Sequence, residues 1–127
     1  MAQPITHRMS DTDALMWTIE RDPLLRSTIT AVIRLDAAPD RDRLRRLIDR
    51  GTRQLPRMRH RVRGNPYSLV PPRWEVDPNF DLDFHLRWVS GGHSMRDVLD
   101  YAQPIAMQSF DRARPQWEIH VIEGLDD

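Results

Sequence analysis

Apolar residues recur every three or four positions in three parts of the chain, which is the spacing of one helical face. Ser10 and Ser94 begin two of these parts and place a side-chain oxygen where the free N–H groups of a first turn need an acceptor. Asp97 completes a pattern like a capping box with Ser94. Pro104 lies inside the third part and is expected to kink or split it. The sequence therefore predicts helices over residues 11–22, 40–55 and 95–110.

Several of the intervening segments alternate apolar and polar residues with a period of two, the pattern of a strand with one buried face. The alternation is clearest from Phe80 to Trp88. An earlier segment is rich in β-branched residues and places Ile29 and Ile33 on one face. A turn is predicted at Gly64-Asn65-Pro66. Strands are expected over residues 27–36, 57–63, 69–77, 80–88 and 117–122.

This order of elements favours an α/β fold with α+β layering, in which helices lie on a mixed sheet. The 127 residues correspond to one small domain. The last predicted strand ends at Gly124, close to the end of the sequence. We therefore expect residues 1–127 to be an incomplete domain, marginally stable, whose last strand has an unpaired edge that favours self-association.

Composition and charge exclude several classes of protein. Charged residues make up 30% of the chain and the formal net charge is zero, which excludes a polycation that coats nucleic acid. Cysteine is absent, so disulfides and thiolate sites are excluded. All 19 basic residues are arginine, so no lysine is available as an amine base or for a Schiff base. The opening MAQPITHRMS lacks the apolar core of a secretory signal, which predicts a cytoplasmic protein.

Ten arginines and only two acidic residues lie between positions 41 and 63. One interpretation is a surface for phosphates, nucleic acid or anionic lipids. The other is that these side chains form the solvated faces of a helix and a strand. No aromatic residue lies in the segment, so bases have no stacking platform and nucleic acid is not expected as a partner. The candidate anionic surface comprises Arg41, Arg45, Arg46, Arg57, Arg59, Arg61 and Arg63.

The residues themselves give no convincing catalytic or metal-binding set. No two of the five histidines stand one helical turn apart, as a zinc-binding helix requires. His120 is the best candidate for a base, although a packing histidine explains its place on a strand equally well. Asp81 and Asp83 would lie about 7 Å apart on one strand face, which is wide for a shared proton. No catalytic residue, metal or cofactor is predicted on this basis.

Three separated blocks of the sequence, together with two shorter pieces, resemble one family of proteins. The matching pieces are Met9-Ser10 through Asp13-Ala14, Trp17-Thr18-Ile19-Glu20, RVR at 61–63, PPRWEVDPNFDLDFHLR at 71–87 and FDRARPQWEIHVIEGL at 110–125. They follow one another in order from about residue 9 to the end. The chain resembles the amino-terminal part of the bacterial wax ester synthase/diacylglycerol acyltransferases, especially the actinobacterial ones.

The resemblance implies the fold of the CoA-dependent acyltransferases, as in chloramphenicol acetyltransferase: two α/β domains with a tunnel between them. It also implies the substrates, an acyl-CoA and a long-chain alcohol or diacylglycerol, and hence the synthesis of wax esters or triacylglycerol. In that family the histidine of an HHxxxDG motif acts as general base on the acceptor hydroxyl. No cofactor is implied, because acyl-CoA is a substrate.

The chain departs from the family pattern at the catalytic motif. It contains no two adjacent histidines and no Asp-Gly dipeptide, so HHxxxDG is missing from these residues. By the resemblance, we expect the 127 residues not to include the family's second domain. The family's Pro-Leu-Trp block is present as Pro115-Gln116-Trp117. The resemblance places Asp13, Trp17, Pro115 and Trp117 at family-motif positions with structural or substrate-tunnel roles.

Three interpretations of function follow from the sequence. The first is a truncated amino-terminal region of such an acyltransferase, inactive alone. The second is a non-catalytic module that binds acyl chains or anionic lipid surfaces, at the periphery of a membrane or lipid body. The third is one half of a split acyltransferase, completed by a carboxy-terminal half on another polypeptide.

Overall fold

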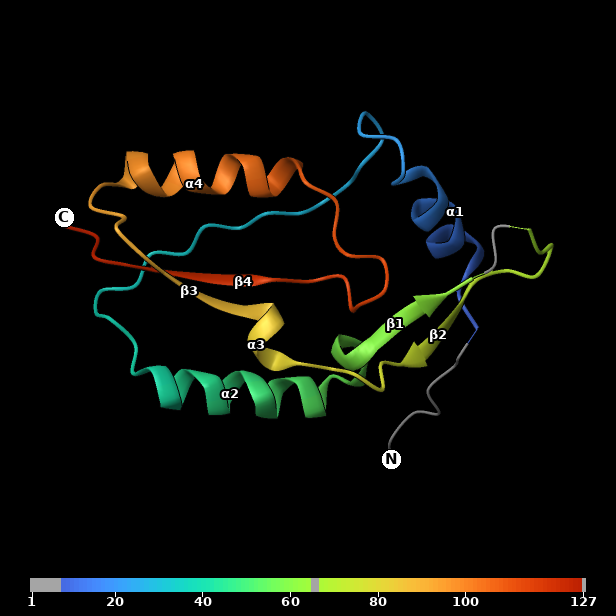
Figure 1. Cartoon of the computed structure of the whole chain (residues 1–127), viewed down its shortest axis with the longest axis horizontal. Coiled ribbons are helices and arrows are strands. Elements are labelled where there is room, and N and C mark those ends of the chain that lie inside the picture. Colours follow the sequence, from blue (N-terminus) through green and yellow to red (C-terminus); the bar gives the residue numbers. More distant parts are fainter. Residues whose placement is uncertain (1–7, 65–66, 127) are drawn as a thin grey trace. The chain divides into compact units, whose positions relative to one another are not determined.

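The computed structural model describes residues 8–64 and 67–126 (Figure 1). The chain divides into two compact units that are interleaved along the sequence. The first unit comprises the residues up to Ser27, together with Leu55–Phe80 and Ser109–Gln116. The second unit comprises Thr28–Gln54, Asp81–Gln108 and the residues from Trp117 onward.

The first unit contains helix α1 and a hairpin of two short strands. Helix α1 (Asp11–Ile19) begins where the sequence predicts, because the Ser10 hydroxyl accepts a hydrogen bond from the backbone N–H of Asp13 at 3.1 Å. A 3₁₀ turn, η1 (Pro56–Arg59), leads into β1 (His60–Arg63), which pairs antiparallel with β2 (Arg73–Val76). Residues 65 and 66 of the predicted turn lie outside the described residues.

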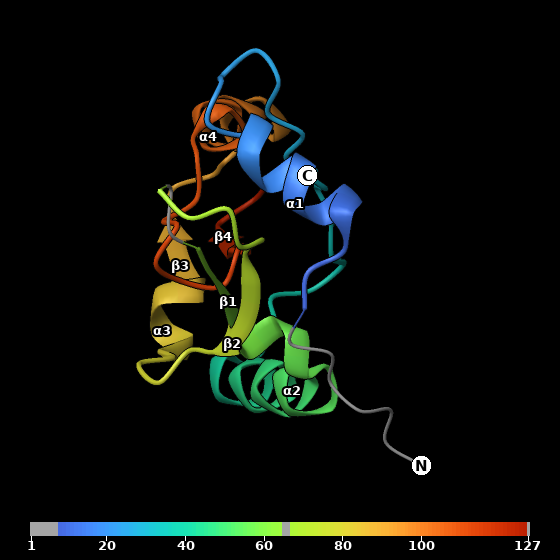
Figure 2. The ribbon, with the colours of Figure 1, turned by 90° about the vertical axis from the view of Figure 1, so that its right-hand side faces the viewer.

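The second unit is built on two parallel strands, β3 (Leu86–Ser90) and β4 (Ile119–Glu123). Parallel neighbours need a long crossover connection, and this one contains α4 (Met95–Met107). Helix α2 (Arg41–Gln54) belongs to the same unit, and Figures 1 and 2 show α2 and α4 on opposite sides of the strand pair. Sandwiching between helices is the usual environment of a parallel sheet.

Side-chain contacts agree with this arrangement of the two faces. On one face, the Arg41 guanidinium of α2 lies 4.9 Å from the centroid of the Trp88 ring and forms an ion pair with Glu123. On the other face, the Tyr101 hydroxyl of α4 lies 2.8 Å from Nδ1 of His120. Each face of the strand pair is therefore tied to one helix.

Helix α4 confirms the predicted capping box at its start. The backbone N–H of Asp97 donates to the Ser94 hydroxyl, and the Asp97 carboxylate accepts from the backbone N–H of Ser94 at 2.8 Å. The hydrogen bonds from Ser94 lower the pKa of Asp97. Pro104 lies within the helix, which continues to Met107 without being split.

Residues 80–88 were expected to form one strand, and that prediction is wrong for the first half. The Asp81 carboxylate accepts a hydrogen bond from the backbone N–H of Asp83 at 3.0 Å, so it caps a single helical turn, α3 (Leu82–His85). The strand begins only at Leu86. A local side-chain cap outweighs the period-two pattern here, because aspartate is strongly favoured as an N-cap. Asp81 and Asp83 therefore do not share a strand face.

Residues 27–36 also differ from the expected strand, since the structure gives them no strand pairing. Ile29 and Ile33 are 93% and 80% exposed. The described residues place the strands in two separate two-stranded sheets, one antiparallel and one parallel, and not in one mixed sheet. A strand exists only where another strand satisfies its backbone, and residues 27–36 belong to neither of the two sheets of the described residues.

The core is small for a chain of this length. The buried apolar side chains in the described residues are Met9, Val62, Leu82, Leu86 and Val98. Many large apolar side chains stay exposed, including Leu24, Leu35 and Leu99. A two-stranded sheet is marginal without further cover, so this apolar surface favours association between chains.

We expect the isolated 15.0 kDa chain to self-associate and to unfold at low temperature. Size-exclusion chromatography with light scattering should give a mass that rises above the monomer value as concentration increases. A monomer at every concentration, with a cooperative melt above about 60 °C, would contradict this expectation.

Candidate functional site

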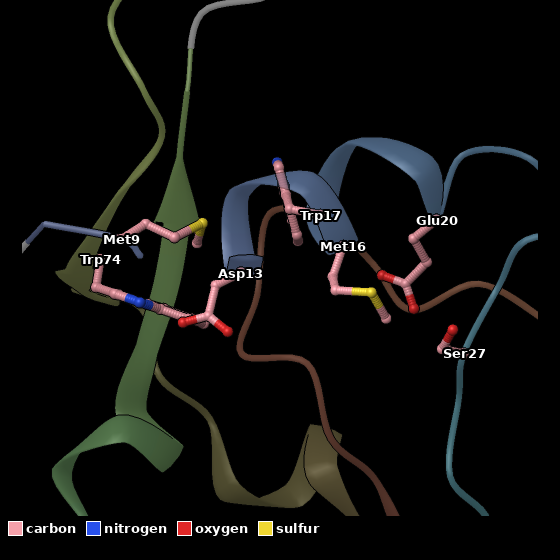
Figure 3. A pocket seen from close by; sticks show the side chains of 7 residues that line it. All are labelled: Met9, Asp13, Met16, Trp17, Glu20, Ser27 and Trp74. Atoms are coloured by element: carbon pink, nitrogen blue, oxygen red, sulfur yellow. The ribbon is translucent and has the colours of Figure 1, made fainter. Parts of the chain in front are cut away.

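Two of the four family-motif positions, Asp13 and Trp17, lie together in a pocket of the first unit (Figure 3). The pocket has a volume of about 240 Å³. Figure 3 shows that its side chains come from α1, from the segments on either side of α1 and from β2. The lining residues are Met9, Asp13, Met16, Trp17, Glu20, Ser27 and Trp74. Asp13 and Trp17 are brought together because they stand one turn apart on α1.

Arg112 holds Trp17 in place, although it is not among the residues predicted from the sequence. Its guanidinium carbon lies 3.6 Å from the centroid of the Trp17 ring, and one of its N–H groups donates to the Trp17 carbonyl oxygen at 3.0 Å. Burial lowers the pKa of Arg112, with a further contribution from Arg21 nearby. Arg112 lies inside the family-like block at 110–125, and this position is the one feature of the sequence that could indicate its importance.

The third motif position, Pro115, is buried in a tight loop of the same unit. The Gln116 side-chain amide donates to the carbonyl oxygens of Asp111 and Arg114, each at 2.7 Å. These two bonds close the loop on itself. The glutamine in the middle of the Pro-Gln-Trp block therefore has a structural role. The leucine of the family pattern could not take this role, because its side chain has no hydrogen-bonding group.

The fourth position, Trp117, belongs to the second unit and precedes β4. Its ring stacks on the imidazole of His85, with centroids 4.5 Å apart and an interplanar angle of 20°. Nδ1 of His85 lies 2.7 Å from the Trp117 carbonyl oxygen, so this nitrogen carries the proton and donates it. His85 is fully buried. Trp117 thus fixes the start of β4 against α3.

Both ring nitrogens of His120, the candidate base, have a hydrogen-bond partner. Nε2 lies 2.9 Å from a carboxylate oxygen of Glu118, and Nδ1 lies 2.8 Å from the Tyr101 hydroxyl. A carboxylate only accepts, so the neutral ring carries its proton on Nε2 and accepts from Tyr101 at Nδ1. Arg87 in turn pairs with Glu118 at 3.4 Å. The geometry ties β4 to α4 and leaves neither nitrogen free for a substrate hydroxyl.

Most arginines of the candidate anionic surface are engaged within their own units. In the second unit, Arg41 pairs with Glu123, and Arg45 pairs with Asp83 at 3.1 Å. Among residues 8–64 and 67–126, the structure gives no ion pair to Arg46. The binding of an anionic surface by these arginines stays a prediction.

In the first unit, Arg61 and Arg63 pair with Glu75 at 2.8 and 3.4 Å. The hydrogen bond from Arg61 is the main cause that lowers the pKa of Glu75. Arg57 and Arg59 lie over the rings of Trp74 and Phe80.

Two kinds of feature are absent from the residues that the structure describes. In residues 8–64 and 67–126, no group of three histidine or acidic side chains is placed to hold a metal ion. Across the same part of the chain, no helix has the length and apolarity required to cross a membrane.

Comparisons with known proteins place these observations in a family. The sequence profile of the wax ester synthase/diacylglycerol acyltransferase catalytic domain matches residues 9–127. A Mycobacterium tuberculosis protein with the provisional name diacylglycerol O-acyltransferase is 38% identical over 97% of this chain and 26% of its own length. A second protein of that species with the same provisional name is 33% identical over 94% of this chain and 26% of its length.

A solved structure supports the same family at the level of the fold. The wax ester synthase/diacylglycerol acyltransferase from Marinobacter aquaeolei VT8 is 31% identical and matches with a TM-score of 0.50. The match covers 72% of this chain and 24% of that one. The chain therefore spans about a quarter of the length of the relatives it matches.

The contact between Arg112 and Trp17 is expected to stabilise the fold around the pocket. We expect Arg112→Ala to lower the free energy of unfolding by about 1–3 kcal/mol, because it removes a cation–π contact and a hydrogen bond from a charged donor. Urea titration followed by tryptophan fluorescence measures this loss. Arg21→Ala, at an exposed neighbouring position, should change stability by less than about 0.5 kcal/mol. Equal losses in both variants would rule out a specific role for Arg112.

Proposed function

The chain belongs to the wax ester synthase/diacylglycerol acyltransferase family, and from this we propose that it forms the amino-terminal region of an acyl-CoA-dependent acyltransferase of triacylglycerol or wax ester synthesis. The observation that carries the proposal is the family match over residues 9–127. The match covers about a quarter of the length of each relative, which agrees with one region of such an enzyme.

Ester formation from a thioester needs a group that takes the proton of the attacking hydroxyl as the carbon–sulfur bond to CoA breaks. No two histidines are adjacent in the 127 residues, so this chain lacks the base that the family motif would supply. His120 is a poor substitute, because both of its ring nitrogens are already hydrogen-bonded within the fold. In this proposal the region contributes framework and substrate-facing surface, and the general base comes from elsewhere.

We expect the purified chain to be inactive alone. Incubation with palmitoyl-CoA and hexadecanol, or with a diacylglycerol, should release free CoA no faster than the uncatalysed background. Loss of a general base typically costs about 10²–10⁴-fold in rate. Turnover above background that disappears in His120→Ala would assign the base to His120 and overturn this part of the proposal.

A second candidate function, binding to an anionic lipid surface, is favoured by one face of α2. Arg43, Arg46 and Arg50 recur at intervals of three and four residues, so they lie on one side of the helix, and all three are exposed. Leu47 lies among them and is 61% exposed. We call these four residues the basic face. Basic residues that flank an exposed apolar residue suit a helix lying on a membrane surface.

The basic face makes binding to vesicles depend on charge. We expect binding to phosphatidylglycerol-containing liposomes but not to pure phosphatidylcholine, with a loss at high salt as the Debye length shortens. The triple variant Arg43→Gln, Arg46→Gln, Arg50→Gln should bind at least tenfold more weakly. The control Arg21→Gln, Arg73→Gln, Arg96→Gln changes the net charge equally at exposed sites outside α2. Equal binding to both kinds of liposome, or equal loss in both triple variants, would contradict a role for the basic face.

A further inference from the structure

The pocket of the first unit that Figure 3 shows, which we call the α1 pocket, contains two carboxylates. These are Asp13 and Glu20, and the other lining residues include no arginine and no histidine. All of the lining residues belong to the first unit. Among residues 8–64 and 67–126, the structure gives neither carboxylate an ion pair. The α1 pocket therefore offers two negative charges to a ligand.

The positions of the two carboxylates lie about 10 Å apart along one face of α1, because seven helical residues each add about 1.5 Å. Glu20 is the C-cap of α1 and keeps helical backbone angles, and its N–H donates to the Met16 carbonyl oxygen at 3.1 Å. Figure 3 shows Asp13, Met16 and Glu20 in this order along the same side of the helix. The pocket thus has an acidic group at each end and an apolar side chain between them.

The walls between the two ends are apolar and aromatic. They are formed by the side chains of Met9, Met16, Trp17 and Trp74. Ser27 adds a hydroxyl beside Glu20 (Figure 3). Alkyl chains of cationic groups pack on surfaces of this kind, and the faces of indole rings attract the cations themselves. The volume of about 240 Å³ corresponds to about eight non-hydrogen atoms at about 30 Å³ each. The pocket therefore suits a small ligand.

Two arginines lie on the tryptophan rings without lining the pocket. Arg112 lies 3.6 Å from the centroid of Trp17, and Arg57 lies 4.5 Å from that of Trp74. Burial is the main cause that lowers the pKa of Arg112, and Glu20 acts on this pKa in the opposite direction. Glu20 therefore lies within electrostatic range of a cation of the fold. Its attraction for a ligand cation is accordingly weaker than that of Asp13.

We propose that the α1 pocket binds a short aliphatic diamine, with one ammonium group at Asp13 and the other at Glu20. Ammonium groups that pair with carboxylate oxygens at about 2.8 Å leave about 5 Å of the spacing between the two nitrogens. An extended chain of three or four methylene groups spans about 5–6 Å. These groups would lie on Met16 and Trp17, as the stem of a lysine side chain lies on apolar surface.

Other cations match the α1 pocket less well. A monoamine would leave one carboxylate without a partner. A metal ion needs several oxygen ligands around one point, and positions about 10 Å apart do not converge on one. A quaternary ammonium group has no N–H, so it cannot donate to the carboxylates or to the Ser27 hydroxyl. A primary diamine satisfies both ends and the apolar middle. The site is independent of the acyltransferase proposal, because it is inferred from the pocket alone.

Titration calorimetry of the purified chain tests the binding. We expect 1,3-diaminopropane and 1,4-diaminobutane to bind at least tenfold more tightly than 1-aminobutane, which has one ammonium group. The same margin is expected over 1,8-diaminooctane, which is too long to end at both carboxylates. Binding should weaken as salt is added, because the Debye length shortens. Tryptophan fluorescence should change in the same order of ligands, since Trp17 and Trp74 line the pocket.

Charge-neutralising variants locate the site. The double variant Asp13→Asn, Glu20→Gln keeps the shape of the side chains and should weaken binding of 1,4-diaminobutane at least tenfold. The matched control Asp11→Asn, Asp42→Asn changes the net charge equally at exposed positions outside the pocket. Because Arg112 lies near Glu20, Asp13→Asn alone should weaken binding more than Glu20→Gln alone. Circular dichroism should show the same helix content in all of these variants.

A charge swap separates loss of the site from loss of folding. Asp13→Lys places an ammonium group at one end of the pocket, so the preferred ligand should become 4-aminobutanoate, which carries one ammonium and one carboxylate. We expect this variant to bind 4-aminobutanoate at least fivefold more tightly than 1,4-diaminobutane, a gain that requires a folded pocket. Equal binding of 1-aminobutane and 1,4-diaminobutane, equal loss in the two double variants, no binding of any diamine, or an unchanged preference in Asp13→Lys would each overturn the proposal.

Discussion

The parallel pairing of β3 with β4 is the constraint on which the second unit depends. Leu86 pairs with Ile119 and Ser90 with Glu123, across a separation that the crossover through α4 must span. The contact of Trp117 with His85 sets where β4 begins, and the bridge from Tyr101 to His120 ties the crossover helix back onto it. Two parallel strands do not form a stable sheet on their own. The pair therefore depends on the cover that α2 and α4 give its two faces.

The positions that the family resemblance indicates have framework contacts in this structure. Trp17 is fixed by Arg112, Pro115 lies in a loop closed by Gln116, and Trp117 is stacked on His85. None of these contacts moves a proton or binds a leaving group. These contacts hold each of the positions within its own unit.

Local signals allowed prediction of the helices, and tertiary context decided the strands. Ser10 and the Ser94–Asp97 capping box act on their own first turns, so both helix starts could be predicted from neighbouring residues. The strand prediction failed at residues 82–85, because the Asp81 carboxylate caps a helical turn there and the alternation of apolar residues does not reveal this cap. Residues 27–36 have the pattern of a strand, but pairing depends on a partner that the pattern does not identify. The contact of Arg112 with Trp17 and that of Tyr101 with His120 could not be predicted, because each joins distant segments that only the fold brings together.

Amide hydrogen exchange of the isolated chain, at concentrations where it is monomeric, tests most directly whether its sheet is incomplete. Slow exchange is predicted for the backbone amides of α4, whereas residues 29–35 should exchange at nearly the rate of an unfolded chain because no strand pairs with them. Protection of residues 29–35 equal to that of α4 in a monomer would show that this chain completes its own sheet, and would contradict the account.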